Sequence, residues 1–154
     1  MMKKGKKRTY LFFIAGIIIV VVIAVSFALM NRPVSLSDLL DGDMYQIMAI
    51  SSTAGIDPDG VEEAELLGYL AEYRMRRVWL TDQTYSVPPD EELYNVMIRD
   101  EDGDGAYVKV FLCAGKKTRF DLNLGAKGGV RVYEAISGEE NTPLLLKMLQ
   151  TMIG

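Results

Sequence analysis

The chain has 154 residues, among them 17 Lys and Arg, 21 Asp and Glu, one Cys and no His. Without histidine there is no Ser-His-Asp triad, no Cys-His dyad and no His-ligated zinc site. A single cysteine excludes an internal disulfide and a CxxC redox pair. The sequence also lacks a Walker A loop and a GxGxxG fingerprint. These exclusions favour a protein that is not an enzyme and that holds no cofactor.

The charge is distributed unevenly along the chain. Residues 3–8 hold five Lys or Arg and no acidic residue, residues 10–30 hold no charge, and residues 31–154 hold 12 basic and 21 acidic residues. As a helix, the 21 mostly apolar residues of the middle segment would span roughly 32 Å, close to the hydrocarbon thickness of a bilayer. Its β-branched residues favour a strand in water, but backbone groups in lipid must pair within their own segment. The pattern predicts a transmembrane signal-anchor helix over residues 10–30.

The basic residues predict how this helix is oriented. Five Lys or Arg precede the span and only Arg32 follows it closely, so the positive-inside rule puts the N-terminus in the cytoplasm and the C-terminal part outside the cell. Arg8 and Tyr10 are expected to anchor the helix at one membrane interface, and Arg32 at the other. The first predicted partner is therefore the lipid bilayer of the cell membrane.

A cleaved signal peptide is the alternative for the same segment. Small residues at Ala24-Val25-Ser26 and Ser26-Phe27-Ala28 have the spacing of a cleavage site, and cleavage would release a secreted domain. The apolar run is longer than the usual 7–15 residues of a signal peptide, which favours an uncleaved anchor. The basic N-terminus directly precedes the span, so we interpret it as a topology determinant and expect no nucleic-acid partner.

The remaining residues are sufficient for one compact domain. The chain is expected to comprise a basic cytoplasmic N-terminus (1–9), the anchor (10–30), a stalk (31–43) with a short helical turn at Leu36–Leu40, and an extracytoplasmic domain (44–154). The first strand of that domain, Met44–Ser51, has apolar residues on both faces, which predicts a central or covered strand.

A helix and five more strands follow in the predicted domain. Asp59 and Glu62 have the spacing of a capping box, and Arg74, Arg76 and Arg77 are placed at the favourable C-terminal end of the helix. The later strands are predicted by β-branched, aromatic and alternating apolar residues at 78–85, 93–99, 107–113, 117–124 and 130–136.

A second helix, capped by Asn141 or Thr142, ends the chain. Short consecutive strands with tight turns favour an antiparallel meander. The predicted fold class is α+β: a single N-terminal transmembrane helix followed by an antiparallel sheet of about five to six strands covered by two helices.

One acidic loop has part of a calcium-binding pattern. Asp100, Asp102 and Asp104, followed by Gly105, match the opening DxDxDG of a calcium loop. The twelfth position is Phe111, where a bidentate Glu is required, and a strand pattern follows instead of a helix. We interpret the segment as an acidic hairpin turn. Calcium held by the three aspartates is the alternative.

Other reactive residue types have structural interpretations. Cys113 lies in a predicted strand and has no histidine to activate it, which favours a buried thiol. The adjacent carboxylates Asp90-Glu91-Glu92 are interpreted as solvated charge rather than an acid–base pair, so a carboxylate-based hydrolase ranks last. Packing is expected for most of a set of aromatic residues that could also form a binding face: Tyr73, Trp79, Tyr85, Tyr94, Tyr107 and Tyr133.

Three segments carry a resemblance to a known type of protein. The segment Val78–Pro89 (with Thr84 and Ser86-Val87-Pro88-Pro89), the hairpin Val108–Leu124 and the segment Gly129–Tyr133 resemble a family of small membrane-anchored extracytoplasmic domains of unknown function from Gram-positive bacteria. The resemblance covers residues 44–136 and implies a bacterial, extracytoplasmic α+β domain without implying an activity.

The predicted function follows from the anchor, the small size and the lack of a catalytic constellation. We expect a single-pass membrane protein whose extracytoplasmic domain binds or regulates another membrane or cell-surface protein. A calcium-responsive extracytoplasmic domain is the alternative, as is a secreted domain if the N-terminal segment is cleaved.

Overall fold

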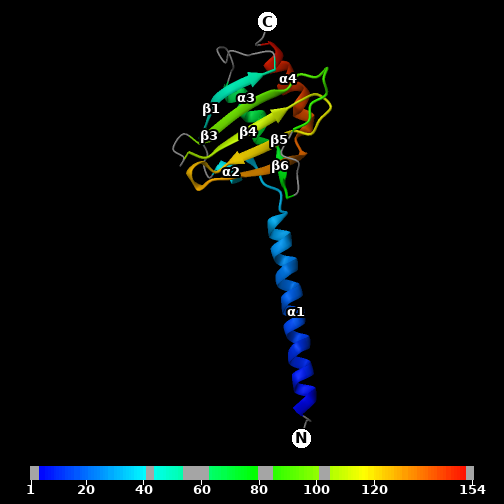
Figure 1. Cartoon of the computed structure of the whole chain (residues 1–154). Coiled ribbons are helices and arrows are strands. Elements are labelled where there is room, and N and C mark those ends of the chain that lie inside the picture. The colour runs from blue at the N-terminus through cyan, green and yellow to red at the C-terminus, as the bar shows by residue number, and fades with distance from the viewer. Residues whose placement is uncertain (1–3, 41–43, 54–62, 80–84, 101–104, 152–154) are drawn as a thin grey trace. The chain divides into compact units, whose positions relative to one another are not determined.

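Figure 1 shows the computed structural model of the chain, which describes residues 4–40, 44–53, 63–79, 85–100 and 105–151. The chain divides into two compact units, Met1–Arg32 and Pro33–Gly154. The predicted capping residues Asp59 and Glu62 lie outside the described residues.

The first unit is a single helix, α1 (Lys4–Met30). Its segment Tyr10–Met30 is long and apolar enough to cross a membrane, and none of it is buried. The helix ends where predicted, because the backbone N–H and the side-chain amide of Asn31 both donate hydrogen bonds to the carbonyl of Phe27 (3.1 and 2.8 Å).

The second unit is built from six strands and three α-helices in the described part of the chain. In chain order they are α2 (Leu36–Leu40), β1 (Tyr45–Ser52), α3 (Glu63–Ala71), β2 (Arg74–Val78), β3 (Tyr94–Asp100), β4 (Tyr107–Leu112), β5 (Arg119–Asn123), β6 (Val130–Ser137) and α4 (Thr142–Thr151). Two 3₁₀ turns, η1 (Gly125–Lys127) and η2 (Glu139–Asn141), precede β6 and α4.

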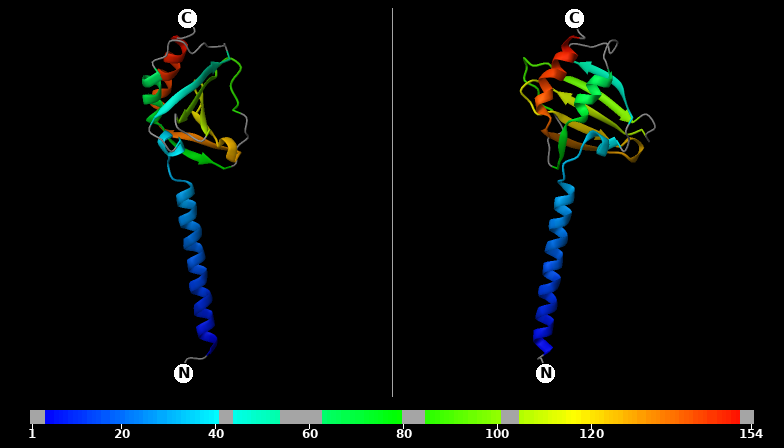
Figure 2. Two further views of the ribbon diagram at one scale, coloured as in Figure 1. Left: turned by 90° about the vertical axis from the view of Figure 1, so that its left-hand side faces the viewer. Right: turned by 180° about the vertical axis from the view of Figure 1, so that it is seen from behind.

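All six strands form one antiparallel sheet with the order β1-β3-β4-β5-β6-β2. Strands β3 to β6 form a meander as predicted, whereas β2 lies beside β6 and not before β3 in the sheet. Strands β1 and β2 lie at opposite edges, so the connection that contains α3 crosses from one edge of the sheet to the other. Helices α3 and α4 lie side by side across one face of the sheet (Figure 2, right). The predicted α+β class, with a sheet covered by two helices, is confirmed.

The first strand was predicted to be central or covered, and the central position was wrong, since β1 is an edge strand. A register shift between Ile47 and Ala49 inserts one residue, and Ile47 and Ile50 therefore both reach the core. Met48, at the shift, is exposed. The apolar residues that suggested two covered faces are thus divided between the core and a bulge.

The second strand also begins earlier than predicted. Helix α3 ends at Ala71, and Arg74, Arg76 and Arg77 belong to strand β2 instead of the helix end. Tyr73 lies between the two elements with its side chain fully buried. Burial of this ring and of Met75 fixes an extended backbone where charge alone favoured a longer helix. Of the predicted strand 78–85, only Val78 lies in a described strand, and residues 80–84 are outside the described residues.

The predicted stalk is largely part of the folded unit. Helix α2 forms where predicted, with Ser35 as its N-cap: the Ser35 N–H and hydroxyl donate to the Asp38 carboxylate (2.7 and 2.8 Å). Its side chains Leu36 and Leu40 are buried in the core, which is why the compact unit begins at Pro33 and not at Met44.

Alternate residues of the strands form the core beneath the helices. Strands β3 and β4 contribute Tyr94, Val96, Ile98, Val108, Val110 and Leu112, and α3 and α4 contribute Leu66, Leu70, Leu145, Leu146 and Leu149. Each of the two strands therefore has one apolar face and one mixed face, as the alternating pattern of residues 107–113 predicted for β4.

A network of hydroxyl groups joins β5, the start of β2 and helix α4. Tyr73 and Thr142 share a hydrogen bond of 2.6 Å, and the hydroxyls of Thr118 and Thr142 both donate to Oε2 of Glu139 (3.2 and 2.9 Å). Glu139 Oε1 accepts the Thr118 backbone N–H (2.8 Å). Burial raises the pKa of Tyr73. The network satisfies its buried polar atoms, so its role is structural.

Candidate binding surface on the helix-free face of the sheet

Figure 1 looks onto the face of the sheet opposite to the helices. Strand register places its side chains in rows that cross the sheet from edge to edge. The first row is Ser51, Asn95, Phe111, Arg119, Glu134 and Arg76; the second is Ala49, Met97, Lys109, Asp121, Val132 and Val78; the third is Gln46, Arg99, Tyr107, Asn123 and Val130. Neighbours in such a row have Cβ atoms about 5 Å apart and interact directly.

An aromatic pair occupies the middle of this face. The rings of Tyr85 and Phe111 stack with centroids 5.6 Å apart and an interplanar angle of 26°. The Tyr85 hydroxyl donates to the backbone carbonyl of Lys117 (2.9 Å), which fixes the ring over the sheet. Burial is the main cause that raises the pKa of Tyr85. The segment that begins at Tyr85 therefore covers part of the helix-free face.

Two cations flank the Phe111 ring. The Nζ of Lys109 lies 5.1 Å and the guanidinium carbon of Arg119 lies 5.7 Å from the ring centroid. Asp121 holds the guanidinium of Arg119 through two contacts, Nε to Oδ1 at 2.6 Å and Nη2 to Oδ2 at 3.0 Å. Lys109 forms no ion pair with any described residue.

The degree of burial separates these cations. Arg119 is only 5% exposed, so its charge requires the Asp121 carboxylate beside it. Lys109 is half-buried and has no carboxylate paired with it among the described residues. An aromatic ring with an unpaired cation at its side suits an anionic or aromatic group on a partner.

One acceptor on this face has no partner in the described chain. Oδ1 of Asn95 is buried without a hydrogen bond, and Asn95 stands beside Phe111 in the register. An unsatisfied buried acceptor costs free energy, so this position weakens the packing of the face.

Sequence reasoning did not identify Lys109, Phe111, Arg119 and Asp121 as a group. Lys109 and Phe111 alternate with the buried Val108, Val110 and Leu112, and that alternation was recognised. Which residues of β5 stand opposite them depends on the register of the β4–β5 hairpin, and that register was not predicted.

The aromatic set, for most of which packing was predicted, is half buried in the core and half partly exposed. Tyr73, Tyr94 and Tyr133 are buried, and Tyr73 packs against Phe120 with ring centroids 5.5 Å apart. Tyr94 donates a hydrogen bond to Glu92 Oε2; burial and this carboxylate raise the pKa of Tyr94 to about 12. Tyr85, Tyr107 and Trp79 keep partial exposure.

The acidic loop joins strands β3 and β4. Asp100 is the last residue of β3, whereas Asp102 and Asp104 lie outside the described residues. No group of three His, Cys, Asp or Glu in the described ranges could hold a metal ion. Calcium binding by Asp100, Asp102 and Asp104 therefore stays a prediction.

Cys113 follows β4 and is fully buried, and burial raises the pKa of its thiol. A protonated, inaccessible thiol is a poor nucleophile, in agreement with the structural interpretation. The loop carboxylates Asp90 and Glu91 are exposed.

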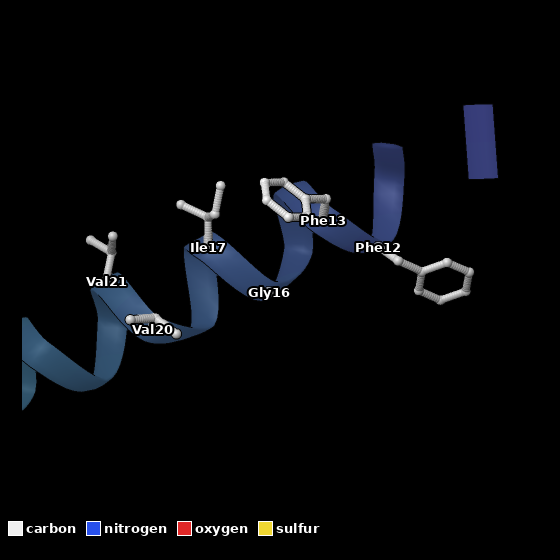
Figure 3. A pocket seen from close by; sticks show the side chains of 6 residues that line it. All are labelled: Phe12, Phe13, Gly16, Ile17, Val20 and Val21. Atoms are coloured by element: carbon white, nitrogen blue, oxygen red, sulfur yellow. The ribbon is translucent and has the colours of Figure 1, made fainter. Parts of the chain in front are cut away.

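The predicted membrane anchors lie at both ends of α1. Arg8 is within the helix, Tyr10 is exposed, and Arg32 follows the helix end and is also exposed. Figure 3 shows a shallow groove on α1 where Gly16 has no side chain, lined by Phe12, Phe13, Ile17, Val20 and Val21. The lining is apolar, so the groove offers nothing to a polar ligand.

In comparisons with protein-family models, with curated proteins and with solved structures, no match to this chain was found. The resemblance to an extracytoplasmic family of unknown function stays a prediction.

Proposed function

We propose that the chain is a single-pass membrane protein with its N-terminus in the cytoplasm and residues 33–154 outside the cell as a binding domain. The observation that carries this proposal is the uncharged segment Tyr10–Met30, a helix directly preceded by five cations. An exposed apolar helix of this length is stable in lipid and a liability in water. The basic flank supports this orientation through the positive-inside rule.

The helix-free face of the sheet supports a binding role for the domain. Its three rows contain four cations (Arg76, Arg99, Lys109 and Arg119) and two carboxylates (Asp121 and Glu134). Residues 31–154 as a whole have 12 basic and 21 acidic residues, so the side chains of these three rows have the opposite net charge from the domain as a whole. The partner favoured by this charge is an acidic segment of another membrane or cell-surface protein.

The anchor is tested by fractionating cells that express the chain with a C-terminal tag. We expect a full-length product by intact mass, in the membrane fraction, whose tag is lost when protease is added to whole cells. Ile18→Arg with Val21→Arg should abolish insertion, because each central arginine costs roughly 2.5–3.5 kcal/mol. Ile18→Leu with Val21→Leu is the matched control and should insert normally.

Two results would contradict the proposed topology. A soluble product that begins near Val25–Leu29 would identify a cleaved signal peptide and a secreted domain. A membrane-bound product whose tag resists protease on whole cells, but not in lysed cells, would reverse the orientation.

The binding face is tested separately with a photo-crosslinking residue in place of Lys109, and in place of Lys147 on α4 as the control. Both lysines lie outside the core. We expect one discrete crosslinked product from position 109, weakened by salt, and none from position 147. Equal products from both positions would remove the helix-free face as the binding surface.

A further inference from the structure

Strand β2 carries a cluster of arginines at one edge of the sheet. Arg74, Arg76 and Arg77 occupy three of its five positions, and Arg74 and Arg76 are exposed. None of the three forms an ion pair with a described residue. Two described acidic residues lie near the strand in sequence or register: Glu72 accepts a hydrogen bond from Asn141, and Glu134 stands opposite Arg76 without an ion pair to it. The edge is therefore a basic site in an acidic domain.

The same strand is tied to the segment that follows α1. Val34 and Met75 exchange two backbone hydrogen bonds, each of 2.9 Å. Helix α1 ends at Met30, and the four residues from there to Val34 reach at most about 14 Å. The headgroup layer adds about 5–7 Å outside the hydrocarbon core. A chain anchored by α1 therefore keeps β2 within reach of the headgroups.

An amphipathic aromatic residue stands at the end of this strand. Trp79 is 45% exposed, and the guanidinium of Arg77 lies 3.7 Å above its ring. Tryptophan is enriched where membranes meet water, because its ring is apolar and its N–H is a donor. Arginine beside it offers paired donors that match a phosphate group.

We propose that the edge formed by Arg74, Arg76, Arg77 and Trp79 docks on anionic phospholipid headgroups of the membrane that α1 spans. This inference rests on the proposed anchor. Docking by this edge places the exposed side chains of Arg74 and Arg76 beside headgroup phosphates, because an anionic lipid surface attracts basic residues near it. The chemistry recognised is the headgroup phosphate and its net negative charge, with the indole ring at the interface.

The chain contains its own reporter for this contact, since Trp79 is its only tryptophan. The full chain is reconstituted in nanodiscs of phosphatidylcholine alone, or of phosphatidylcholine with about one third phosphatidylglycerol. Brominated lipids quench tryptophan fluorescence on contact. We expect stronger quenching and a blue-shifted emission in the anionic discs, reduced by salt because the Debye length is about 10 Å at 0.1 M.

Arg74→Gln with Arg76→Gln should lower the ratio of docked to undocked chains by roughly fivefold for each arginine removed. These changes leave the Arg77–Trp79 contact in place. Lys116→Gln with Lys117→Gln removes the same charge from an exposed turn before β5, which β6 separates from β2 in the sheet, and should leave the quenching unchanged. Circular dichroism checks that both variants keep the fold.

The outcomes separate this inference from the proposed anchor. A chain that does not purify with the discs contradicts the anchor itself. A chain that inserts, but shows equal quenching in both lipid mixtures, overturns the docking of β2; its arginines would then serve only to prevent edge-to-edge pairing with another sheet. An equal response of the two double variants would also overturn it, since only bulk charge would then matter.

Discussion

The same strands form both faces of the sheet, but the two faces differ in the type and the burial of their side chains. Under the helices the positions are filled almost entirely by fully buried apolar side chains such as Val96, Ile98 and Val110. On the helix-free face the neighbouring positions hold Asn95, Met97 and Phe111, and their rows alternate charge, amide and ring. Each strand therefore packs the core with the side chains of its covered face. On the helix-free face the same strand presents polar, charged and aromatic side chains.

The difference teaches where substitutions are tolerated. The apolar face is close-packed, so any lost volume leaves a cavity. The mixed face is stabilised by interacting pairs such as Arg119 with Asp121 and Tyr85 with Phe111. Both residues of such a pair can be substituted together. Binding properties can change on that face without loss of the fold.

The largest expected contrast is between adjacent residues of β3. Ile98→Ala, on the covered face, should lower the free energy of unfolding by roughly 2–5 kcal/mol because it opens a cavity in the core. Met97→Ala, half-buried on the other face, should cost about 1 kcal/mol or less. Urea unfolding of the full chain in detergent, followed by Trp79 fluorescence, measures both. Equal losses would refute the division of the sheet into two faces.

Gly138 tests how closely the covered side is packed against Tyr73. A Cβ at Gly138 would lie 2.9 Å from Cα and 3.0 Å from Cγ of Tyr73, and the residue has a φ of +91°. Gly138→Ala should therefore cost about 3 kcal/mol, from strain and overlap together. Gly115→Ala is the control: its φ is +67° but no atom lies near its Cβ, so about 1 kcal/mol of strain is expected. Similar costs at both glycines would mean that the overlap with Tyr73 is relieved.

Local patterns predicted most elements of this fold. The antiparallel class, strands β3 to β6, helix α2 and helix α4 follow from alternation, caps and turn residues. Two non-local facts were not predictable: the bulge in β1, and the burial of Tyr73 that ends α3 and starts β2 early. Both depend on contacts with residues far along the chain, which propensity does not contain.

The residues of the candidate binding face were harder to predict from the sequence than the fold. Its central residues Phe111 and Arg119 meet only because the β4–β5 hairpin adopts one register; a shift of one residue would put Phe120 in the place of Arg119. Tyr85 reaches the face from a segment without regular structure, and no periodicity predicts such a contact.

The free energy of unfolding should fall at high pH because of the phenol of Tyr94, which lies on the covered face of the sheet. Its pKa is about 12 in the folded chain against 10 in the unfolded chain, so the folded chain keeps the phenol proton between these values. This contribution is complete below pH 10 and is lost as the pH rises to 12, by up to about 3 kcal/mol. Tyr94→Phe should flatten the fall in unfolding free energy between pH 9 and 12. Part of the slope should remain, because burial also raises the pKa values of Tyr73 and Tyr85.

A control with the same loss of one phenol, Tyr69→Phe on α3, should keep the slope of the unsubstituted chain. If both substitutions flatten the curve equally, the loss at high pH reflects general charge and not Tyr94.

The Arg119–Asp121 pair should behave as a unit on the helix-free face. Asp121→Ala leaves the buried side chain of Arg119 without this carboxylate and should cost about 2 kcal/mol. Replacing both residues, as Arg119→Met with Asp121→Leu, should recover most of that loss, since two apolar groups need no pairing. Urea unfolding of the single and double variants gives the coupling energy. A double variant less stable than Asp121→Ala would show that Arg119 stabilises the face without Asp121.

The smallest effect is expected at Tyr85, whose ring covers only the part of the helix-free face around Phe111. Tyr85→Phe keeps the stack on Phe111 but removes the hydrogen bond to the Lys117 carbonyl, which is worth about 1 kcal/mol or less.

Because Cys113 is the only thiol and is fully buried beside this region, its alkylation rate measures local opening. We expect the alkylation rate to rise up to about fivefold. The free energy of global unfolding should fall by no more than the contribution of this hydrogen bond. Tyr107→Phe, which loses the Asn123 amide bond in another row of the same face, should leave the rate unchanged. If both variants accelerate alkylation equally, Cys113 is exposed by opening of the whole face, and the segment at Tyr85 has no separate role in covering it.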